Sequence, residues 1–401
     1  MKKVIFTILI FFMALNNVLA LALPIEVTAD SMILIDRDKN EVIYEKNPDK
    51  EEILASLTKI MTVYTAVQKI NNLYRKVTIT EKDVNNLIGF TCIGLQAGDV
   101  VTYQDLLYAT NLTSAADAAQ ALALHLSGSM QAFVDDMNAN AKAMGLKHTH
   151  FSDTYGRGDD NVSTAREMSI LLSEALKNET FERVFNTTYY KMSNGLESIN
   201  YTRSIAAYHG LDTGLITGNK SGYTPEAGLL LASTATINGV NYMLITMHSQ
   251  ENEKLTTHVL DSWKIYNYVS THEFTERVIL RRGETIKKIH VNGGTTSDYV
   301  VTMDHDVKAL LTDNDFENLK VDYHIADYIS PDNKIGDNLG FIDIKVGDQI
   351  IESINIYLKD DIFSYQKRSI FALILIICLI FFGLILLFIN LFVKKRKSST
   401  K

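Results

Sequence analysis

Residues 51–67 read EEILASLTKIMTVYTAV, a pattern that predicts a helix entering a buried core although it contains a serine and a lysine among apolar neighbours. Residues three apart lie on the same face of a helix, so the Lys59 amine can reach the Ser56 hydroxyl. A serine becomes a strong nucleophile only when a base takes its proton. A lysine can act as that base if burial or a neighbouring cation lowers its pKa. The stretch therefore indicates an activated serine.

The Ser-x-x-Lys pair alone is weak evidence, because it recurs at Ser364–Lys367, and a surface lysine near a capping serine gives the same pattern. A second candidate is KSGYTPEAG, residues 220–228, which places a cation, a hydroxyl and a glycine on or beside a predicted strand. Such a strand can pair with an extended peptide. Lys220 and Ser221 can then bind a carboxylate, and Gly222 allows close approach to the backbone. The alternative is a turn with an exposed lysine.

The third candidate is Ser114 in TSAADAAQALA, residues 113–123. It precedes an alanine-rich helix, so it is either a helix N-cap or a hydroxyl that relays a proton between Lys220 and a leaving group. Ser114 follows Ser56 by 58 residues, and Lys220 follows Ser114 by 106. Ser-x-x-Lys, a serine motif and Lys-Ser/Thr-Gly, in that order, are characteristic of penicillin-binding proteins and serine β-lactamases.

Together ASLTKIMT, SAADAAQALA, AMGLKHTHFSDTYG and KSGYTPEAG resemble the serine D-alanyl-D-alanine carboxypeptidases, the low-molecular-mass penicillin-binding proteins, over roughly residues 29–268. The resemblance implies an acyl-enzyme mechanism that removes the terminal D-alanine from peptidoglycan stem peptides, with β-lactams as covalent inhibitors. No metal or cofactor is expected. Carried over by motif, the catalytic residues are Ser56, Lys59 and Ser114, and the substrate-binding residues are Lys220, Ser221, Gly222 and Tyr223. The backbone N–H groups of Ser56 and Tyr223 would form the oxyanion hole.

Ala116 departs from the family pattern, because the motif usually reads Ser-x-Asn and here reads Ser114-Ala115-Ala116. If the carboxamide normally holds the site lysine and the substrate amide, then Ala116→Asn speeds acylation. If a nearby group, such as Asn111 or a water molecule, already fills the role, asparagine crowds the site. Leu54 also replaces a common proline, from which we expect little effect.

Two other functions fit parts of this pattern. A β-lactamase would share the fold, but the extra β domain and a C-terminal membrane span argue against it. A catalytically weak or silent cell-wall-binding protein is favoured by Ala116 and opposed by the intact Ser56, Lys59 and Lys220.

The rest of the pattern predicts an α+β domain, an antiparallel sheet flanked by helices, over residues 23–272. A small all-β domain is expected at residues 273–362, where apolar and polar residues alternate. Asn238-Gly239 is a strong hairpin signal. Further hairpin and helix predictions fall at residues 32–47, 103–126 with a break at 111–114, 130–146, 164–178 and 259–272.

Both ends of the chain have the composition of membrane-targeting segments. Residues 1–22 have the layout of a cleavable signal peptide, with an uncleaved anchor as the alternative. Residues 369–393 predict one transmembrane helix, and the basic tail 394–401 favours a cytoplasmic C-terminus. Residues 1–22 and 367–401 contain nine of the 39 basic residues and no acidic ones, which leaves 30 basic against 47 acidic residues between them, a net charge of about −17. Such an acidic exported portion argues against nucleic-acid binding.

Overall fold

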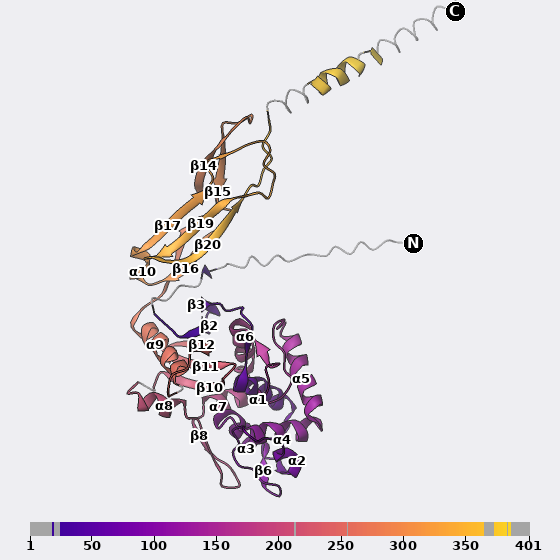
Figure 1. Ribbon diagram of the computed structural model, residues 1–401, viewed down its shortest axis with the longest axis vertical. Helices are drawn as coiled ribbons and strands as arrows, with labels where there is room; N and C mark the ends of the chain where they lie inside the picture. The colour runs from indigo at the N-terminus through magenta and orange to yellow at the C-terminus, as the bar shows by residue number, and fades with distance from the viewer. Residues whose placement is uncertain are drawn as a thin grey trace, which may run out of the picture. The chain divides into compact units, whose positions relative to one another are not determined.

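The computed structural model describes residues 18–19, 25–211, 214–254, 256–364, 373–382 and 384–385 (Figure 1). Within these ranges the chain forms two compact units. The first comprises residues 18–276 together with 310–313, and the second comprises residues 277–309 together with 314 onwards. The predicted signal peptide lies outside the described residues except for its residues 18–19, which form the short strand β1 (Val18–Leu19).

A five-stranded antiparallel sheet forms the centre of the first unit. Its strands, in spatial order, are β10 (Ile216–Thr224), β11 (Gly228–Ile237), β12 (Val240–Ser249), β2 (Ala29–Asp36) and β3 (Glu41–Lys46). The predicted hairpin at Asn238-Gly239 joins β11 to β12, and both turn residues have the positive φ that a type I′ turn requires. The sheet order leaves β10 at one edge, where it can pair with an extended ligand.

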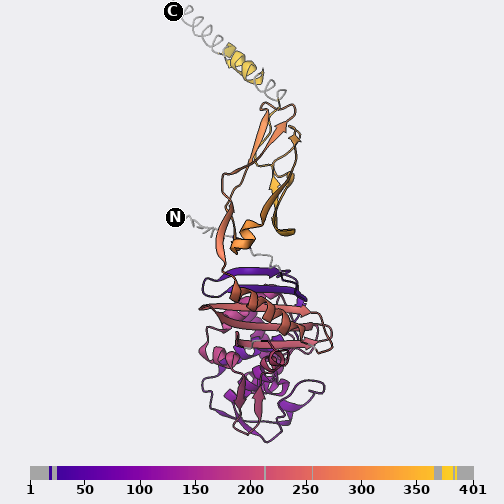
Figure 2. The same ribbon diagram turned by 90° about the vertical axis from the view of Figure 1, so that its left-hand side faces the viewer.

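Alternation along the strands gives the sheet two different faces. Leu230 and Ala232 of β11 face a large apolar core shared with the helices that carry the predicted site. Ser233 belongs to the opposite face of β11, where its hydroxyl contacts the Tyr266 hydroxyl of α9 (Thr257–Thr271) at 3.0 Å. Helix α9 lies over β11 and β12 (Figure 2). Because Lys220 pairs with Ala232, its side chain belongs to the face with the large core.

The remaining helices and short strands of the first unit surround this core. They are β4 (Glu52–Ile53), the 3₁₀ helix η1 (Ala55–Leu57), α1 (Thr58–Lys69), β5 (Lys76–Thr78), α2 (Glu81–Val84), β6 (Val100–Thr102), α3 (Tyr103–Leu112), α4 (Ala116–Ser127), α5 (Met130–Ala143), β7 (Val162–Ser163), α6 (Ala165–Ala175), α7 (Glu179–Asn186), β8 (Tyr189–Lys191), β9 (Glu197–Ile199) and α8 (Thr202–Tyr208). The predicted helix break at residues 111–114 is confirmed by the gap between α3 and α4. Thr164 is the N-cap of α6, and its hydroxyl accepts from the Glu167 N–H.

The second unit consists mainly of β-structure, as predicted. The elements that lie wholly or mostly in it are β13 (Thr275–Leu280), β14 (Thr285–Val291), β15 (Asp298–Thr302), β16 (Val307–Leu311), α10 (Asp313–Glu317), β17 (Leu319–Ile325), β18 (Tyr328–Ile329), β19 (Asn338–Val346) and β20 (Gln349–Tyr357). Ile342 and Ile344 of β19 have no exposed surface and belong to its interior.

The predicted transmembrane segment, residues 369–393, lies partly outside the described residues. Residues 373–382 and 384–385 are helical. In the part of the chain that the structure describes, no helix combines the length and apolar character needed to cross a bilayer.

Candidate active site

Ser56 lies in the 3₁₀ helix η1, not in the α-helix that the sequence predicted, and α1 begins two residues later. The turn depends on the residue before it, because Ala55 has φ +41°, a left-handed conformation that costs a non-glycine residue energy. Gly156 supports this turn from outside. A Cβ at Gly156 would lie 1.8 Å from the Ala55 carbonyl oxygen, so only glycine fits there. The backbone at Ser56 is thus held in an unusual conformation by its neighbours.

Lys59 lies one turn further, in the first turn of α1, and only 2% of its surface is exposed. Its Nζ donates to the Ser56 hydroxyl at 3.0 Å and to the Tyr155 carbonyl oxygen at 2.8 Å. Burial lowers the pKa of Lys59 to about 7, and the charge of Asp153 opposes this shift only in part. An amine with such a pKa is available as a base at neutral pH.

Ser114 has φ +63° and lies between α3 and α4. It is not the N-cap of α4, because that position belongs to Ala115. The Ser114 hydroxyl instead accepts from Lys220 Nζ at 3.0 Å, and Lys220 also donates to the Ser221 carbonyl oxygen at 2.7 Å. Burial lowers the pKa of Lys220 well below its ordinary value, and the charge of Lys59 lowers it further. The structure therefore brings the two predicted lysines into one electrostatic environment.

Strand β10 passes directly beside the nucleophile turn. A Cβ at Gly222 would lie 3.1 Å from the Ser56 backbone nitrogen and 3.2 Å from that of Leu57. Gly222 thus lets the strand approach η1 more closely than any other residue would. Tyr223 follows on β10, with 39% of its surface exposed, and Ser221 is half-buried. All seven predicted site residues lie on these adjoining elements.

Ala116 is packed in an apolar cluster with Leu87, Ala119 and Tyr155. Its N–H donates to the Thr91 carbonyl oxygen at 2.8 Å. The next residue, Asp117, is buried, and its carboxylate accepts the backbone N–H groups of residues 93–95. The loop that precedes β6 is therefore fixed against the start of α4, where the family pattern has asparagine.

The Tyr155 carbonyl, the second acceptor for Lys59, is a site group that the sequence does not indicate. A backbone carbonyl can belong to any residue type, so no sequence motif identifies it as an acceptor. The segment TYG, residues 154–156, is the one sequence signal near it.

Asn111 does not replace the carboxamide that the family has at position 116. Its amide is buried and donates to the Val184 carbonyl oxygen.

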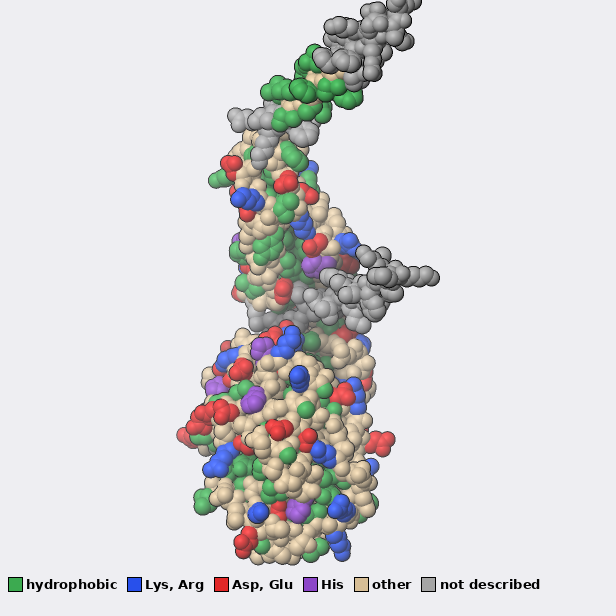
Figure 3. All heavy atoms as spheres, turned by 90° about the vertical axis from the view of Figure 1, so that its right-hand side faces the viewer, with side chains coloured by type: hydrophobic (Ala, Val, Ile, Leu, Met, Phe, Trp, Pro, Cys, Tyr) green, Lys and Arg blue, Asp and Glu red, His purple; other side chains and the backbone are tan. Residues whose placement is uncertain are grey.

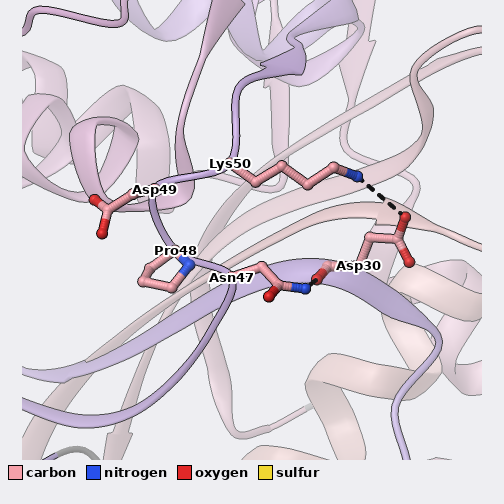
Figure 4. Close-up of a pocket in the computed structure, with 5 residues that line it drawn as sticks. All are labelled: Asp30, Asn47, Pro48, Asp49 and Lys50. Carbon is pink, nitrogen blue, oxygen red and sulfur yellow. Dashed lines mark hydrogen bonds and ion pairs between the residues drawn. The ribbon is translucent and has the colours of Figure 1, made fainter. Parts of the chain in front are cut away.

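A separate surface hollow of about 540 Å³ is lined by Asp30, Asn47, Pro48, Asp49 and Lys50 (Figure 4). Its Lys50 ammonium points to the Asp30 carboxylate at 3.3 Å. None of the seven predicted site residues lines this hollow, and its charged groups are paired with each other or with Glu52 and Arg166.

The arrangement of a serine hydrogen-bonded to a buried lysine, facing a second serine–lysine pair beside an edge strand, defines a serine acyl-transfer enzyme of the penicillin-binding class. Comparison with known families gives the narrower assignment. The D-alanyl-D-alanine carboxypeptidase family matches residues 17–251, and the C-terminal domain of penicillin-binding protein 5 matches residues 274–363. The chain belongs to the D-alanyl-D-alanine carboxypeptidase family and is a serine-type carboxypeptidase.

Individual relatives agree with this family. The chain is 28% identical to the D-alanyl-D-alanine carboxypeptidase DacF of Bacillus subtilis over 360 residues, 85% of this chain and 89% of that protein. It is 34% identical to the D-alanyl-D-alanine carboxypeptidase of Streptomyces sp. strain K15 over 247 residues, 56% of this chain and 81% of that protein.

Two solved structures resemble the fold. The Streptomyces K15 DD-transpeptidase has a TM-score of 0.55 at 30% identity, covering 61% of this chain and 97% of its own. Penicillin-binding protein 5 of Haemophilus influenzae has a TM-score of 0.58 at 22% identity, covering 86% of this chain and 100% of its own, which supports the fold alone. The fold thus has the expected penicillin-binding domain followed by a β domain.

Proposed function

We propose that Ser56 is the nucleophile and Lys59 the base of the carboxypeptidase reaction. Ser56 Oγ attacks the carbonyl between the two terminal D-alanines of a stem peptide while its proton passes to Lys59 Nζ. The supporting geometry is the 3.0 Å contact between these atoms, together with a pKa of Lys59 lowered to about 7. The Ser56 and Tyr223 N–H groups stabilise the developing oxyanion, as donors of this kind do by a few kcal/mol.

In the second half of acylation, the amine of the leaving D-alanine takes a proton from Lys220 through the Ser114 hydroxyl, which contacts Lys220 Nζ, and the peptide bond breaks. Lys220 and Ser221 hold the carboxylate of that D-alanine. The proton that Lys59 took from Ser56 replaces the one that Lys220 gave up, so Lys59 is a free amine again. Water then attacks the Ser56 ester with Lys59 as base, the bond to Ser56 Oγ breaks as the proton returns to that oxygen, and the shortened peptide is released. β-Lactams acylate the same serine, because their strained amide occupies the place of the scissile peptide bond.

The observation that carries this proposal is the convergence of two serine–lysine pairs beside β10. A fluorescent penicillin should label the wild type and fail to label Ser56→Ala. Ser152→Ala, which alters an exposed serine in the segment that leads to Tyr155, should be labelled like the wild type. Peptide mapping that finds the adduct on another residue would reject Ser56 as the nucleophile.

The fate of the acyl-enzyme separates the carboxypeptidase from the alternatives. A carboxypeptidase releases D-alanine from a D-Ala-D-Ala peptide and holds the penicilloyl adduct for a long time. Rapid turnover of benzylpenicillin with no D-alanine release would instead identify a β-lactamase, and absence of both reactions would identify a silent wall-binding protein.

We also propose that the enzyme is exported and anchored in the cell membrane by a single C-terminal span, with the bulk of the chain outside and the C-terminus in the cytoplasm. The signal-like residues 1–22, the uncharged residues 370–393 and the basic tail support this proposal. Protease added to intact cells should remove the segment before Lys367 and leave a tag after Lys401 intact. Protection of the large segment, with loss of the tag, would reverse the orientation.

A further inference from the structure

A basic side chain, Arg157, lies at the edge of the active site and has no part in the proposed mechanism. Its neighbour Gly156 contacts Ala55, and Tyr155 contributes the carbonyl that accepts from Lys59. Residues 155–157 therefore flank the nucleophile turn on one side, while Gly222 of β10 flanks it on another. Arg157 is exposed, so its guanidinium is accessible to a ligand that reaches the nucleophile turn.

Two aromatic side chains, Phe90 and Tyr155, hold Arg157 in place. Its guanidinium carbon lies 5.6 Å from the centre of the Phe90 ring, a cation–π arrangement. The centre of the Phe90 ring lies 5.2 Å from the centre of the Tyr155 ring. Burial raises the pKa of the Tyr155 phenol, and Arg157 opposes that shift through its charge and a side-chain hydrogen bond. The two aromatic rings thus form a platform that positions a cation without neutralising it.

The Arg157 charge has no acidic partner in the part of the chain that the structure describes, since no ion pair joins it to a carboxylate. The Asp153 carboxylate is nearby, but it accepts the backbone N–H groups of residues 155–157. Asp117 is likewise occupied by backbone N–H groups. In an exported segment that is acidic as a whole, an unpaired, positioned arginine beside a catalytic serine indicates a site for an anion.

We propose that Arg157 is a specificity-determining residue that binds a side-chain carboxylate on the amino acid preceding the D-Ala-D-Ala terminus. This inference rests on the proposed function, in which Lys220 and Ser221 take the terminal carboxylate of the peptide. Arg157 lies on a different side of Ser56, so the anion it binds is a second one. In this arrangement the acyl part of an extended peptide that pairs with β10 continues past Tyr223, and the proposal requires that a long side chain on that part reaches Arg157.

The test uses two acetylated tripeptides ending in D-Ala-D-Ala. Their first residue is 2-aminopimelate, with its distal carboxyl free in one peptide and amidated in the other. The wild type should prefer the free carboxylate in kcat/KM by roughly tenfold, the effect of one charge-assisted hydrogen bond in a partly desolvated cleft. Arg157→Gln should reduce this preference to near one, Arg157→Lys should retain part of it, and Arg157→Glu should reverse it.

A second pair of probes gives the same comparison without carboxypeptidase turnover. Carbenicillin differs from benzylpenicillin by one carboxylate on the acyl side chain, so the ratio of their acylation rate constants measures the same subsite. Arg75→Gln, which removes another exposed arginine of the first unit, is the matched control and should leave both ratios unchanged. Equal wild-type rates for the free and amidated peptides, or a preference that survives Arg157→Gln, would overturn the inference.

The two proposals, carboxypeptidase activity and carboxylate binding by Arg157, fail with different experimental results. If the wild type releases D-alanine from neither peptide, the carboxypeptidase proposal fails, while the penicillin pair still decides whether Arg157 binds a carboxylate. A variant that no penicillin acylates has a disrupted site, and Arg157→Lys then provides the measurement.

Discussion

At the residue scale, the site depends on two lysines that the fold removes from water. An amine buried to this extent loses hydration that favours its charged form, and its pKa falls accordingly. Lys59 retains hydrogen bonds to Ser56 and Tyr155, so it is positioned as a base without a carboxylate partner that would restore the charge. Burial therefore supplies the reactivity that the sequence pattern Ser-x-x-Lys could only suggest.

The acylation rate should rise with pH, because Lys59 accepts a proton only as the free amine. Its pKa is lowered from 10.5 to about 7, so the ammonium form predominates below that pH and the amine above it. Second-order acylation by benzylpenicillin should therefore increase between about pH 5.5 and 8.5, with half of the maximum near neutrality. Stopped-flow fluorescence across this range is the measurement. A rise in the acylation rate constant that begins only near the ordinary pKa of lysine would show that Lys59 remains charged in the site at neutral pH.

Ala116→Asn should slow acylation, in contrast to the first of the two sequence-based hypotheses. Ala116 is 1% exposed and packs against Leu87 and Tyr155, so a carboxamide would displace the residue whose carbonyl holds Lys59. Overpacking of this kind costs about 1–3 kcal/mol, and a loss of 1.36 kcal/mol in the transition state slows the reaction about tenfold.

The measurements for this substitution are chemical denaturation and the acylation rate constant. Ala139→Asn, on an exposed position of α5, is the matched control for helix propensity and should cost less than about 1 kcal/mol. A folded Ala116→Asn enzyme that reacts faster than the wild type would restore the first hypothesis, that the site lacks a carboxamide.

The site residues that the sequence could identify are those whose side chains define a motif. Residue type and order indicate Ser56, Lys59, Ser114 and Lys220, and the structure brings them together. The Tyr155 carbonyl and the Gly156 contact have no such signal, because each depends on backbone geometry set by distant segments. Arg157 has none for a related reason, since the role of an exposed arginine depends on its neighbours in space.

At the element scale, the nucleophile turn depends on the close approach of Gly156 to Ala55. Gly156→Ala should abolish penicillin labelling and cost more than about 3 kcal/mol, because its Cβ would overlap the Ala55 carbonyl. Gly195→Ala is the matched control. Gly195 also has a positive φ, +91°, but a Cβ there meets no atom within 4 Å. Its cost should be limited to the left-handed conformation, about 1–2 kcal/mol.

Thermal unfolding and penicillin labelling of Gly156→Ala and Gly195→Ala distinguish the cost of the left-handed backbone conformation from the cost of the Cβ overlap with Ala55. If both variants lose the same stability and both are labelled, the contact with Ala55 does not support the turn, and the proposed dependence is wrong.

Sequence periodicity predicted the longer elements well and the short ones poorly. The hairpins at residues 32–47 and at Asn238-Gly239, and the helices α3 to α6 and α9, have clear patterns or turn signals. Helices α7 and α8 and the short strand pairs β5–β6 and β8–β9 were not predicted, because segments of three to eight residues carry too little periodicity. Ser56 was assigned to an α-helix because a single 3₁₀ turn before α1 leaves the spacing of apolar residues almost unchanged.

At the scale of the whole molecule, the chain combines two units with different interiors. The first has one large core that joins the sheet to the helices of the site. The second has three-stranded sheets and a smaller interior. Acidic and basic side chains are interspersed on the face shown in Figure 3, so the excess of negative charge between residues 23 and 366 is not gathered into one patch there.

The two units should unfold in separate transitions, and a β-lactam should stabilise only one of them. The proposed adduct on Ser56 is bound by residues of the first unit, and a ligand stabilises only the unit that binds it. Differential scanning calorimetry of residues 23–364 should therefore show two peaks, with the peak of the first unit moved upward by benzylpenicillin. In Ser56→Ala both peaks should stay in place when benzylpenicillin is added. A single peak that moves as a whole in the wild type would show that the units unfold cooperatively, and stabilisation at the active site would then extend to both units.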